Sequence, residues 1–367
     1  MKEKKYTCDI CHEEHDLSEL TYFDESYLCE DCLRRETFIC RDCGDRHWND
    51  DSADGDLCQT CYDEDYVRCE RCDAVIHYDD ACYHEDEEYH DHPYCRDCFD
   101  MDEIIHDYYY KPEPIFYGDG PRYLGVELEL DDGGENEFCA SKLLDIANAQ
   151  KEHMYIKHDG SLDDGFECVT HPMTLDYHIN QMPWRAILNK AVAKGYLSHQ
   201  AGTCGLHVHI SRNALGANYE EQEATIAKIL YFYEKFWNEI LTFSRRTESQ
   251  AEHWARRYGG GIINPKETLK HAKNSHMGRY AAVNLENEAT IEMRIFRGTL
   301  KYNTFIATLQ MVDEICKVAI SLSDEFMQGL TWLDFVKGIA DGKQVLINYL
   351  KEKRLYVNEP IRNEVEI

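Results

Sequence analysis

The sequence predicts an α+β domain that is preceded by a separate array of small metal-binding modules. Two observations lead to this fold class. In the C-terminal two-thirds, segments that alternate charged and apolar residues are separated by segments with helically spaced apolar residues. In the N-terminal third, thirteen of the seventeen cysteines lie between Cys8 and Cys98. Helices grouped behind a largely antiparallel sheet are typical of the α+β class.

The charge divides along the same line. The 367 residues include 39 Lys and Arg against 70 Asp and Glu, a formal net charge of −31. Residues 1–110 hold 34 acidic and ten basic side chains, a net charge of −24, so the remainder carries −7. Two compositions in one chain predict two domains. We place the metal-binding array at 1–106, a linker rich in aromatic, proline and glycine residues at 107–121, and the α+β domain with C-terminal helices at 122–367.

The composition also excludes several classes of protein. A hydrophobic fraction of 43% with 12% aromatic residues is too high for a disordered acidic chain. No stretch approaches the ~18 consecutive apolar residues of a membrane span, and the first nine residues lack the apolar core of a signal peptide. The acidity disfavours binding to a phosphate backbone. We therefore expect a cytoplasmic protein without a nucleic-acid or membrane partner.

Twelve of the N-terminal cysteines form six C-x-x-C pairs, a spacing that places two thiolates on one Zn²⁺. The pairs are Cys8/Cys11, Cys29/Cys32, Cys40/Cys43, Cys58/Cys61, Cys69/Cys72 and Cys95/Cys98. Long and short gaps between the pairs alternate, which indicates a repeat that begins at Cys8, Cys40 and Cys69. The sequence thus predicts three Cys₄ modules, similar to zinc ribbons or treble clefs, with about three structural zinc ions.

The details of this array stay open at the level of sequence. Disulfides are disfavoured by the paired spacing and the missing signal peptide. Sequential pairing, in which the first pair joins the second, is favoured over a cross-braced scheme. In the third module, five further residues could act as ligands in place of a cysteine: Cys82, His77, His84, His90 and His92. With its net charge of −24 the array would suit a basic protein surface as partner, or serve as a structural appendage.

The α+β domain is expected to contain six strands and five helices. Runs with a period of two residues predict strands at 123–130, 153–157, 165–170, 205–211, 280–285 and 289–296. Runs with helical spacing predict helices at 136–150, 176–196, 219–246, 302–323 and 331–351.

Three of these strands alternate apolar residues with ionisable ones. Their sequences are GVELEL at 125–130, GLHVHIS at 205–211 and TIEMRIF at 290–296. Because successive side chains point to opposite faces, one face of the sheet would be apolar and the other would carry carboxylates, imidazoles and an arginine. Each strand alone could be a solvated edge, but the agreement of all three favours an active-site face. Neighbouring carboxylates repel unless cations neutralise them, and oxygen ligands with imidazole suit Mg²⁺ or Mn²⁺ better than zinc.

These motifs carry a resemblance to a known family. The chain resembles the glutamine synthetase/glutamate–cysteine ligase fold, and most closely its prokaryotic and phage-borne amidoligase branch. The matching pieces are GVELEL at 125–130, HDGSL and FECVTHP within 158–172, CGLHVHIS at 204–211, RYAAVNL at 279–285 and TIEMRIFRGT at 290–299. They span roughly 120–320, so the zinc array lies outside the resemblance.

The resemblance implies a glutamine synthetase-like antiparallel catalytic sheet that binds ATP and two or three Mg²⁺ ions. By motif position, the metal ligands would be Glu127, Glu129, Glu167, His207 and Glu292. His209 and Ser211 stand at nucleotide-contacting positions. Arg294 stands where the family places an arginine on the transferred phosphate, with Arg297 and Arg279 as further candidates for binding and catalysis.

The function implied is an ATP-dependent carboxylate–amine ligase that forms an amide through an acyl phosphate. Small-molecule, peptide or protein carboxylates and amines are all candidate substrates, and the zinc array would recruit a partner or substrate. Two alternatives remain: a phosphotransferase of the same fold that acts on a guanidino or other acceptor, and a non-catalytic zinc-module adaptor. The segment 245–279 holds eight basic and three acidic residues with a triple glycine, so it is either a flap over ATP or an acidic substrate, or a solvated basic loop.

Overall fold

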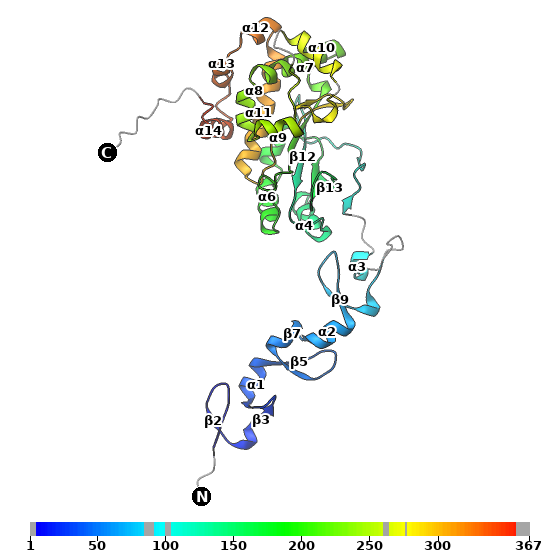
Figure 1. Ribbon diagram of the computed structural model, residues 1–367, viewed down its shortest axis with the longest axis vertical. Helices are drawn as coiled ribbons and strands as arrows, with labels where there is room; N and C mark the ends of the chain where they lie inside the picture. Colours follow the sequence, from blue (N-terminus) through cyan, green and yellow to red (C-terminus); the bar gives the residue numbers. More distant parts are fainter. Residues whose placement is uncertain (1–4, 84–91, 100–103, 260–263, 276, 357–367) are drawn as a thin grey trace, which may run out of the picture. The chain divides into compact units, whose positions relative to one another are not determined.

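The computed structural model describes residues 5–83, 92–99, 104–259, 264–275 and 277–356. The chain divides into two compact units, Met1–Asp102 and Glu103–Ile367, which are considered separately (Figure 1). Among the described residues there is no helix with the length and apolar character that crossing a membrane requires.

The first unit consists of small antiparallel hairpins and short helices. Its paired strands are β1 (Tyr6–Thr7) with β2 (Glu14–His15), β3 (Leu20–Phe23) with β4 (Ser26–Cys29), β5 (Thr37–Ile39) with β6 (Arg46–Trp48), β7 (Ser52–Asp54) with β8 (Leu57–Cys58), and β9 (Tyr66–Arg68) with β10 (Val75–His77). Its helices are α1 (Glu30–Glu36), α2 (Gln59–Asp65) and α3 (Arg96–Phe99).

Each of the first two modules is held by very little apolar packing. The buried core of the first is Leu28 with three cysteines, and that of the second is Leu57 with three cysteines. In both modules the second C-x-x-C pair begins at the end of a strand and continues into the first turn of a helix. A core this small cannot offset the entropy of ordering about thirty residues, so we expect folding here to be coupled to metal binding.

The second unit is built on a seven-stranded sheet with the order β11-β13-β14-β12-β15-β17-β16. The strands are β11 (Ile105–His106), β12 (Leu124–Leu130), β13 (Met154–Lys157), β14 (Phe166–Thr170), β15 (Leu206–Ser211), β16 (Val283–Asn284) and β17 (Thr290–Met293). All neighbours are antiparallel except β11 and β13, which are parallel. The predicted α+β class with a largely antiparallel sheet is confirmed.

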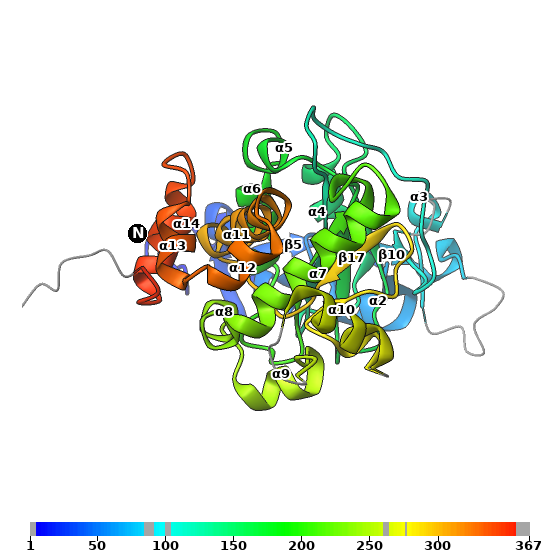
Figure 2. The same ribbon diagram turned by 90° about the horizontal axis from the view of Figure 1, so that it is seen from above.

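The second unit also contains helices, several of which cover one face of this sheet. They are α4 (Glu137–Ala147), α5 (Leu175–Asn180), α6 (Trp184–Ala193), α7 (Tyr219–Lys235), α8 (Trp237–Ser244), α9 (Glu248–Trp254), α10 (Pro265–Asn274), α11 (Tyr302–Ser321), α12 (Asp324–Gly329), α13 (Trp332–Lys337) and α14 (Gln344–Glu352). Figure 1 shows α6, α8 and α11 gathered on one side of β12 and β13, and Figure 2 shows α10 beside α7. The apolar residues of the sheet and of these helices form one continuous buried core.

Three of the predicted helices are divided in the structure, each for a local reason. The segment 176–196 breaks before α6 at Pro183, which has no N–H to continue the helix. The segment 219–246 breaks at Phe236, whose φ and ψ of −108° and 32° are not helical. The segment 331–351 ends its first helix at Gly338 and resumes after Gly342.

The basic segment 245–279 contains two helices that the sequence interpretation missed. Before α10, Asn264 caps the helix by accepting a hydrogen bond from the Glu267 N–H, and Pro265 occupies the first turn. Because α10 packs against α7, much of this segment is part of the folded unit. Gly260 and Gly261 of the triple glycine lie outside the described residues.

The segment 107–121, predicted as a linker, lies within the second unit. Tyr117 forms an isolated parallel bridge with Met173, and its hydroxyl donates to the Glu152 carbonyl at 2.8 Å. Its ring is buried beside His153 and Tyr177. These contacts hold the segment close to the sheet, where it can form a wall of the cavity described below.

Candidate active site

The register of the central strands aligns the charged residues in rows across one face of the sheet. Glu127 of β12 lies opposite His207 of β15, and His209 of β15 lies opposite Glu292 of β17. On the other side of β12, Glu129 lies opposite Glu167 of β14. The apolar residues between them face the helices, so the ionisable set projects from the opposite face. The three polar-faced strands are therefore neighbours, in the order β12-β15-β17.

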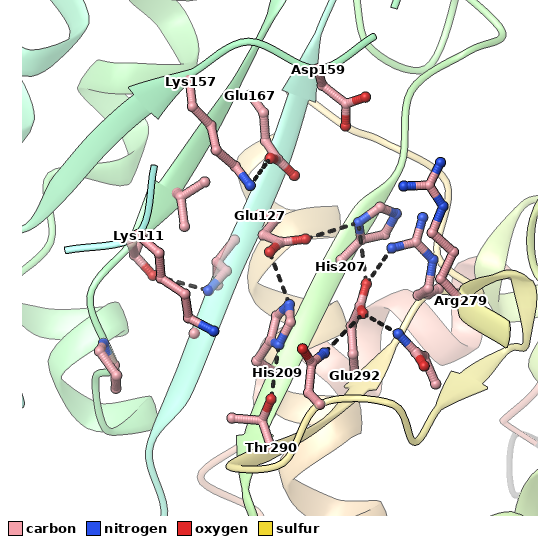
Figure 3. A pocket seen from close by; sticks show the side chains of 18 of the residues that line it. Lys111, Glu127, Lys157, Asp159, Glu167, His207, His209, Arg279, Thr290 and Glu292 are labelled. Atoms are coloured by element: carbon pink, nitrogen blue, oxygen red, sulfur yellow. Dashed lines mark hydrogen bonds and ion pairs between the residues drawn. The ribbon is translucent and has the colours of Figure 1, made fainter. Parts of the chain in front are cut away.

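His207 lies at the centre of a group of carboxylates (Figure 3). Its Nδ1 is 3.3 Å from Glu127 Oε2 and 3.6 Å from Glu292 Oε1, and its Nε2 is 3.5 Å from Glu129 Oε1. The other Glu127 oxygen, Oε1, lies 3.0 Å from His209 Nε2. One ligand atom each from Glu127, His207 and Glu292 lies within 4.8 Å of the other two, which is close enough to share a metal ion.

Glu292 is held in place by donors from two strands. The Asn284 side-chain amide of β16 donates to Glu292 Oε2 at 2.8 Å, and the guanidinium of Arg294 donates from Nη1 to Glu292 Oε1 at 2.5 Å. The carboxylate is only 3% exposed. These two contacts orient Glu292 toward His207 and at the same time fix Arg294 at the edge of the group.

Glu129 and Glu167 face each other across the neighbouring strands β12 and β14. Glu129 accepts a short hydrogen bond from the Gly205 N–H. Glu167 forms an ion pair with Lys157 at 3.0 Å, in which both side chains are largely buried. Lys157 therefore neutralises Glu167 in this structure, while Glu127, His207 and Glu292 form a group of their own.

The carboxylates are held in different electrostatic environments. Burial, followed by repulsion from Glu127, raises the pKa of Glu167 well above its usual range, although Lys157 opposes this shift. Burial also raises the pKa of Glu129. Burial acts on Glu127 in the same direction, but His209 and His207 outweigh it and hold the pKa of Glu127 well below its usual range. Crowded buried carboxylates of this kind favour the binding of a cation.

These residues line a cavity of about 860 Å³. Its floor is the polar face of the sheet, and one wall comes from the segment that follows β11, through Tyr108, Tyr109, Tyr110, Lys111, Pro112, Pro114 and Phe116. Figure 3 shows Lys111 and Lys157 on one side of Glu127 and Arg279 on the other. The cavity thus has room for a nucleotide together with a second ligand, and it offers cationic groups on both sides of the carboxylates.

The remaining predicted site residues have different positions. Ser211, at the end of β15, lines the cavity. Arg279 also lines it, but its guanidinium donates from Nη1 to the Tyr108 hydroxyl at 2.6 Å and is exposed. Arg297 is not among the described residues that line the cavity, and its carbonyl accepts a hydrogen bond from Arg245. The structure therefore gathers Glu127, Glu129, His207, His209 and Glu292 with Arg294, and leaves Arg297 to one side.

Two charged residues of the site were missed at the level of sequence. Lys157 ends β13 and pairs with Glu167, and Arg246 follows α8 and reaches the cavity. A lysine at the end of an apolar strand, directly before the HDG motif, was a signal that could have been used for the first. The sequence contained no signal for Arg246, because this residue follows another arginine at the end of an amphipathic helix and belongs to a generally basic segment.

The twelve cysteines of the first unit form three groups that could each hold a metal ion. The groups are Cys8, Cys11, Cys29 and Cys32; Cys40, Cys43, Cys58 and Cys61; and Cys69, Cys72, Cys95 and Cys98. This is the sequential pairing that the sequence favoured. The sulfur atoms of Cys11 and Cys29 are 3.8 Å apart, as are those of Cys72 and Cys95. A tetrahedral site with Zn–S bonds of about 2.3 Å has sulfur–sulfur edges of about 3.8 Å, so the cysteines fit zinc.

The alternative ligands of the third module have other contacts. Cys82 bridges to Tyr94 in a short antiparallel pair, and its sulfur lies near the Asp80 carbonyl. The imidazole of His77 accepts a hydrogen bond from the Asp79 N–H, and His92 lies 3.7 Å from Glu70. His84 and His90 lie outside the described residues.

Comparison with known proteins finds a family to which part of the chain is similar. A family model described as "Putative amidoligase enzyme" matches residues 145–316. This part of the chain is therefore similar to the amidoligase family. The match includes the strands that carry Glu167, His207 and Glu292, whereas Glu127 and Glu129 precede it. No curated protein sequence matches the chain.

Among solved structures, a bifunctional glutathione synthetase from Pasteurella multocida is similar, with a TM-score of 0.34 and 14% sequence identity. The alignment covers 65% of this chain and 45% of that one, so this protein spans less than half of the other chain. A likeness of this strength supports no argument about activity.

Proposed function

We propose that the second unit is an ATP- and Mg²⁺-dependent carboxylate–amine ligase that works through an acyl phosphate. The observation that carries this proposal is the group of Glu127, His207 and Glu292, with Arg294 beside it, on the floor of a cavity of about 860 Å³. The similarity of residues 145–316 to an amidoligase family supports a ligase in general terms. The zinc array, in this proposal, recruits a protein partner or a substrate.

The donor atoms present fit a divalent cation that prefers oxygen. Two carboxylates and one imidazole can be shared by a single ion, and Glu129 lies 3.5 Å from the same imidazole. Mg²⁺ or Mn²⁺ suits this set better than zinc, which favours sulfur and nitrogen. Bound there, the ion would neutralise charge on the phosphate groups of ATP.

The side chains of this chain would position the reacting groups. Arg294 is fixed by Glu292, and its buried Nε has no partner among the residues that the structure describes. A guanidinium with a free N–H suits a phosphoryl oxygen. His209 is held between Glu127 and the Thr290 hydroxyl, and Ser211 follows it on the same face, so this end of the cavity is our proposed nucleotide end.

The reaction then needs little covalent help from the protein. A carboxylate oxygen of the acyl donor attacks the γ-phosphorus, and the bond to ADP breaks with its electron pair on ADP. An uncharged amine attacks the acyl carbon, inorganic phosphate leaves, and the nitrogen loses a proton as the amide forms. Positioning and electrostatic stabilisation supply most of the rate in such transfers.

The proposal is tested with ATP hydrolysis in the presence of Mg²⁺. Glu292→Gln and Glu127→Gln should each reduce the rate at least about 100-fold, because each removes a carboxylate from the proposed metal site. Glu288→Gln is the matched control, since Glu288 lines the same cavity but is not part of the metal group. Wild-type rates in the first two variants would overturn the site assignment.

The product separates the ligase from its alternatives. Candidate amines and carboxylates are incubated with ATP and followed by mass spectrometry. A product whose mass equals that of the amine plus the carboxylate minus one water supports the ligase. A product that has gained the mass of a phosphoryl group indicates the phosphotransferase. A protein that neither binds nor hydrolyses ATP would be the non-catalytic adaptor.

For the first unit we propose a structural zinc array that docks on a basic protein surface. Residues 1–110, which include this unit, carry a net charge of −24, and this disfavours nucleic acid. We propose a cytoplasmic location, because all seventeen cysteines are unpaired by disulfides and the twelve in the array must stay reduced to bind zinc.

A further inference from the structure

Arg246 lines the cavity and has no role in the assignments above. It follows α8, is 6% exposed and lines the cavity. Its Nε donates to the Ile295 carbonyl at 3.0 Å, and its Nη2 lies 3.5 Å from the Phe296 carbonyl. These two contacts fix the plane of the guanidinium. Its Nη1 is buried and has no partner in the part of the chain that the structure describes.

The guanidinium lies beside the proposed metal group. A Cβ atom placed on Gly205 would come within 2.5 Å of His207 Nε2 and 3.3 Å of Arg246 Nη2. Both side chains therefore pack over the same glycine, whose N–H donates to Glu129. Only a residue without a side chain leaves room for the imidazole and the guanidinium together at this point.

The charges around Arg246 favour the binding of an anion. Burial lowers the pKa of Arg246 to about 10, so it remains a cation at neutral pH, and Arg294, Arg297 and Arg245 add like charge. Attraction to Glu129 opposes this, but among the described residues Arg246 forms no ion pair within 4.0 Å. Burying a cation whose N–H has no acceptor costs free energy, unless a bound ligand supplies both the acceptor and a negative charge. Arg294 adds a second unused donor, its Nε.

We infer that Arg246, together with Arg294, binds the phosphoryl group that is transferred from ATP. This inference rests on the proposed function. In it, Arg246 Nη1 donates a hydrogen bond to a phosphoryl oxygen as the bond to ADP breaks and the bond to the substrate carboxylate forms. The guanidinium keeps its proton throughout, and it stabilises the negative charge that is spread over the phosphoryl oxygens. Arg246 is then a catalytic residue contributed by the end of α8, outside the three strand motifs.

The choice of arginine follows from the geometry. One guanidinium can hold the strand carbonyls through Nε and Nη2 while Nη1 contacts the ligand. A lysine has a single charged nitrogen and cannot fill both roles. Arg246→Lys thus keeps the charge but should lose either the anchor or the phosphoryl contact.

The preceding residue supplies a matched control. Arg245 is a partly buried arginine, and its Nη1 donates to the Gly298 carbonyl and its Nη2 to the Arg297 carbonyl. It is not among the described residues that line the cavity. Arg245→Lys removes similar contacts to the backbone and should leave the phosphoryl contact intact.

The experiment compares ATP with ADP, since only ATP carries the group to be transferred. Binding of each nucleotide with Mg²⁺ is measured by calorimetry for the wild type, Arg246→Lys, Arg246→Gln and Arg245→Lys. We expect both Arg246 variants to bind ATP at least about tenfold more weakly while ADP affinity changes less than about twofold. Hydrolysis of ATP should fall about 100-fold in the Arg246 variants, and stay within about threefold in Arg245→Lys.

A second variant separates a chemical role from a structural one. Arg246→Ala leaves a space in the lining of the cavity, and added guanidinium ion should restore part of its ATP hydrolysis. An effect on folding alone would not be restored in this way. Thermal unfolding of every variant shows which remain folded.

The outcomes are distinct. Folded Arg246 variants with the wild-type ratio of ATP to ADP affinity and the wild-type rate would overturn the inference. An equal loss of ATP and ADP affinity would also overturn it, because Arg246 would then contact a part of the nucleotide that is not transferred. If the wild type itself binds no ATP, the proposed function is refuted, and the inference that rests on it is refuted as well.

Discussion

His178 provides a sharp test of the packing behind the catalytic sheet. Its ring is fully buried on α5, where Nε2 donates to the Leu124 carbonyl at 3.0 Å and Nδ1 accepts from the Trp184 indole N–H at 3.3 Å. Both hydrogen bonds need the neutral ring, because protonated Nδ1 would face another donor. Leu124 begins β12, the strand that carries Glu127 and Glu129, so His178 ties the back of the site to a helix.

The magnitude follows from the shift in pKa. Burial lowers the pKa of His178 from 6.5 to about 4. The unfolded chain therefore binds a proton at His178 between pH 6.5 and 4, whereas the folded chain does not. Stability contributed by the neutral ring is complete above pH 6.5 and is lost as the pH falls through this window, by about 3 kcal/mol at pH 4.

The assay is urea unfolding at several pH values from 7 to 4, followed by hydrogen exchange and mass spectrometry of peptides from residues 103–367. His178→Gln keeps a donor for the Leu124 carbonyl but cannot titrate. We expect it to be about 1 kcal/mol less stable than the wild type at pH 7, because the indole N–H loses its acceptor. The difference in free energy of unfolding between the wild type and His178→Gln should shrink and then change sign as the pH falls to 4, because only the wild type loses the stability of the neutral ring.

The control replaces an exposed histidine of the same unit, as in His158→Gln. Carboxylates elsewhere also titrate in this range, so the difference between variant and wild type is the informative quantity. A free energy of unfolding that falls in parallel for the wild type and His178→Gln, from pH 6.5 to 4, would refute the reasoning.

Three further predictions concern the metal array, the site and the packing of the second unit. A zinc chelator should unfold only the first unit. Elemental analysis of the untreated protein should give about three zinc ions per chain, and one zinc ion or none would contradict three Cys₄ sites. Gly205→Ala should lower ATP hydrolysis at least about tenfold, since its Cβ would displace His207, while Gly329→Ala, which meets no atom within 4 Å, should be neutral. Asp313→Asn should lower the free energy of unfolding by about 2 kcal/mol, because it removes the carboxylate that the partly buried Arg122 and Lys343 share, although Lys343 keeps its ion pair with Glu314. Asp145→Asn, which breaks an exposed pair, should cost less than about 1 kcal/mol, and equal losses would argue against the burial effect.

The sheet and its polar face could be predicted because their signals are local. The alternation of Glu127 and Glu129 with apolar residues is visible within one strand, and the same holds for His207, His209 and Glu292. A strand with one apolar face must bury that face, so the opposite face is determined as well. The tetrads of cysteines were predictable for a similar reason, because each C-x-x-C pair is a compact turn and the spacing of the pairs repeats.

The breaks in the helices needed more than periodicity. Apolar spacing continues across Pro183 and across Phe236, so a periodic pattern joined segments that the structure separates. The missing N–H of proline was a signal in the sequence that could have been weighed more heavily. The break between α7 and α8 at Phe236 has no signal in the local sequence, so tertiary packing determines it.

The sequence by itself determined the class of the fold, the cysteine modules and the set of ionisable residues on the sheet. Only the tertiary structure decided which of them meet: that His207 lies among three carboxylates, that Lys157 neutralises Glu167, and that Arg246 arrives beside Gly205 from a helix end. The physical reason is that alternation along a strand is a short-range property, whereas strand order, register and the approach of a helix end depend on contacts between residues that lie 10 to 80 positions apart in the chain.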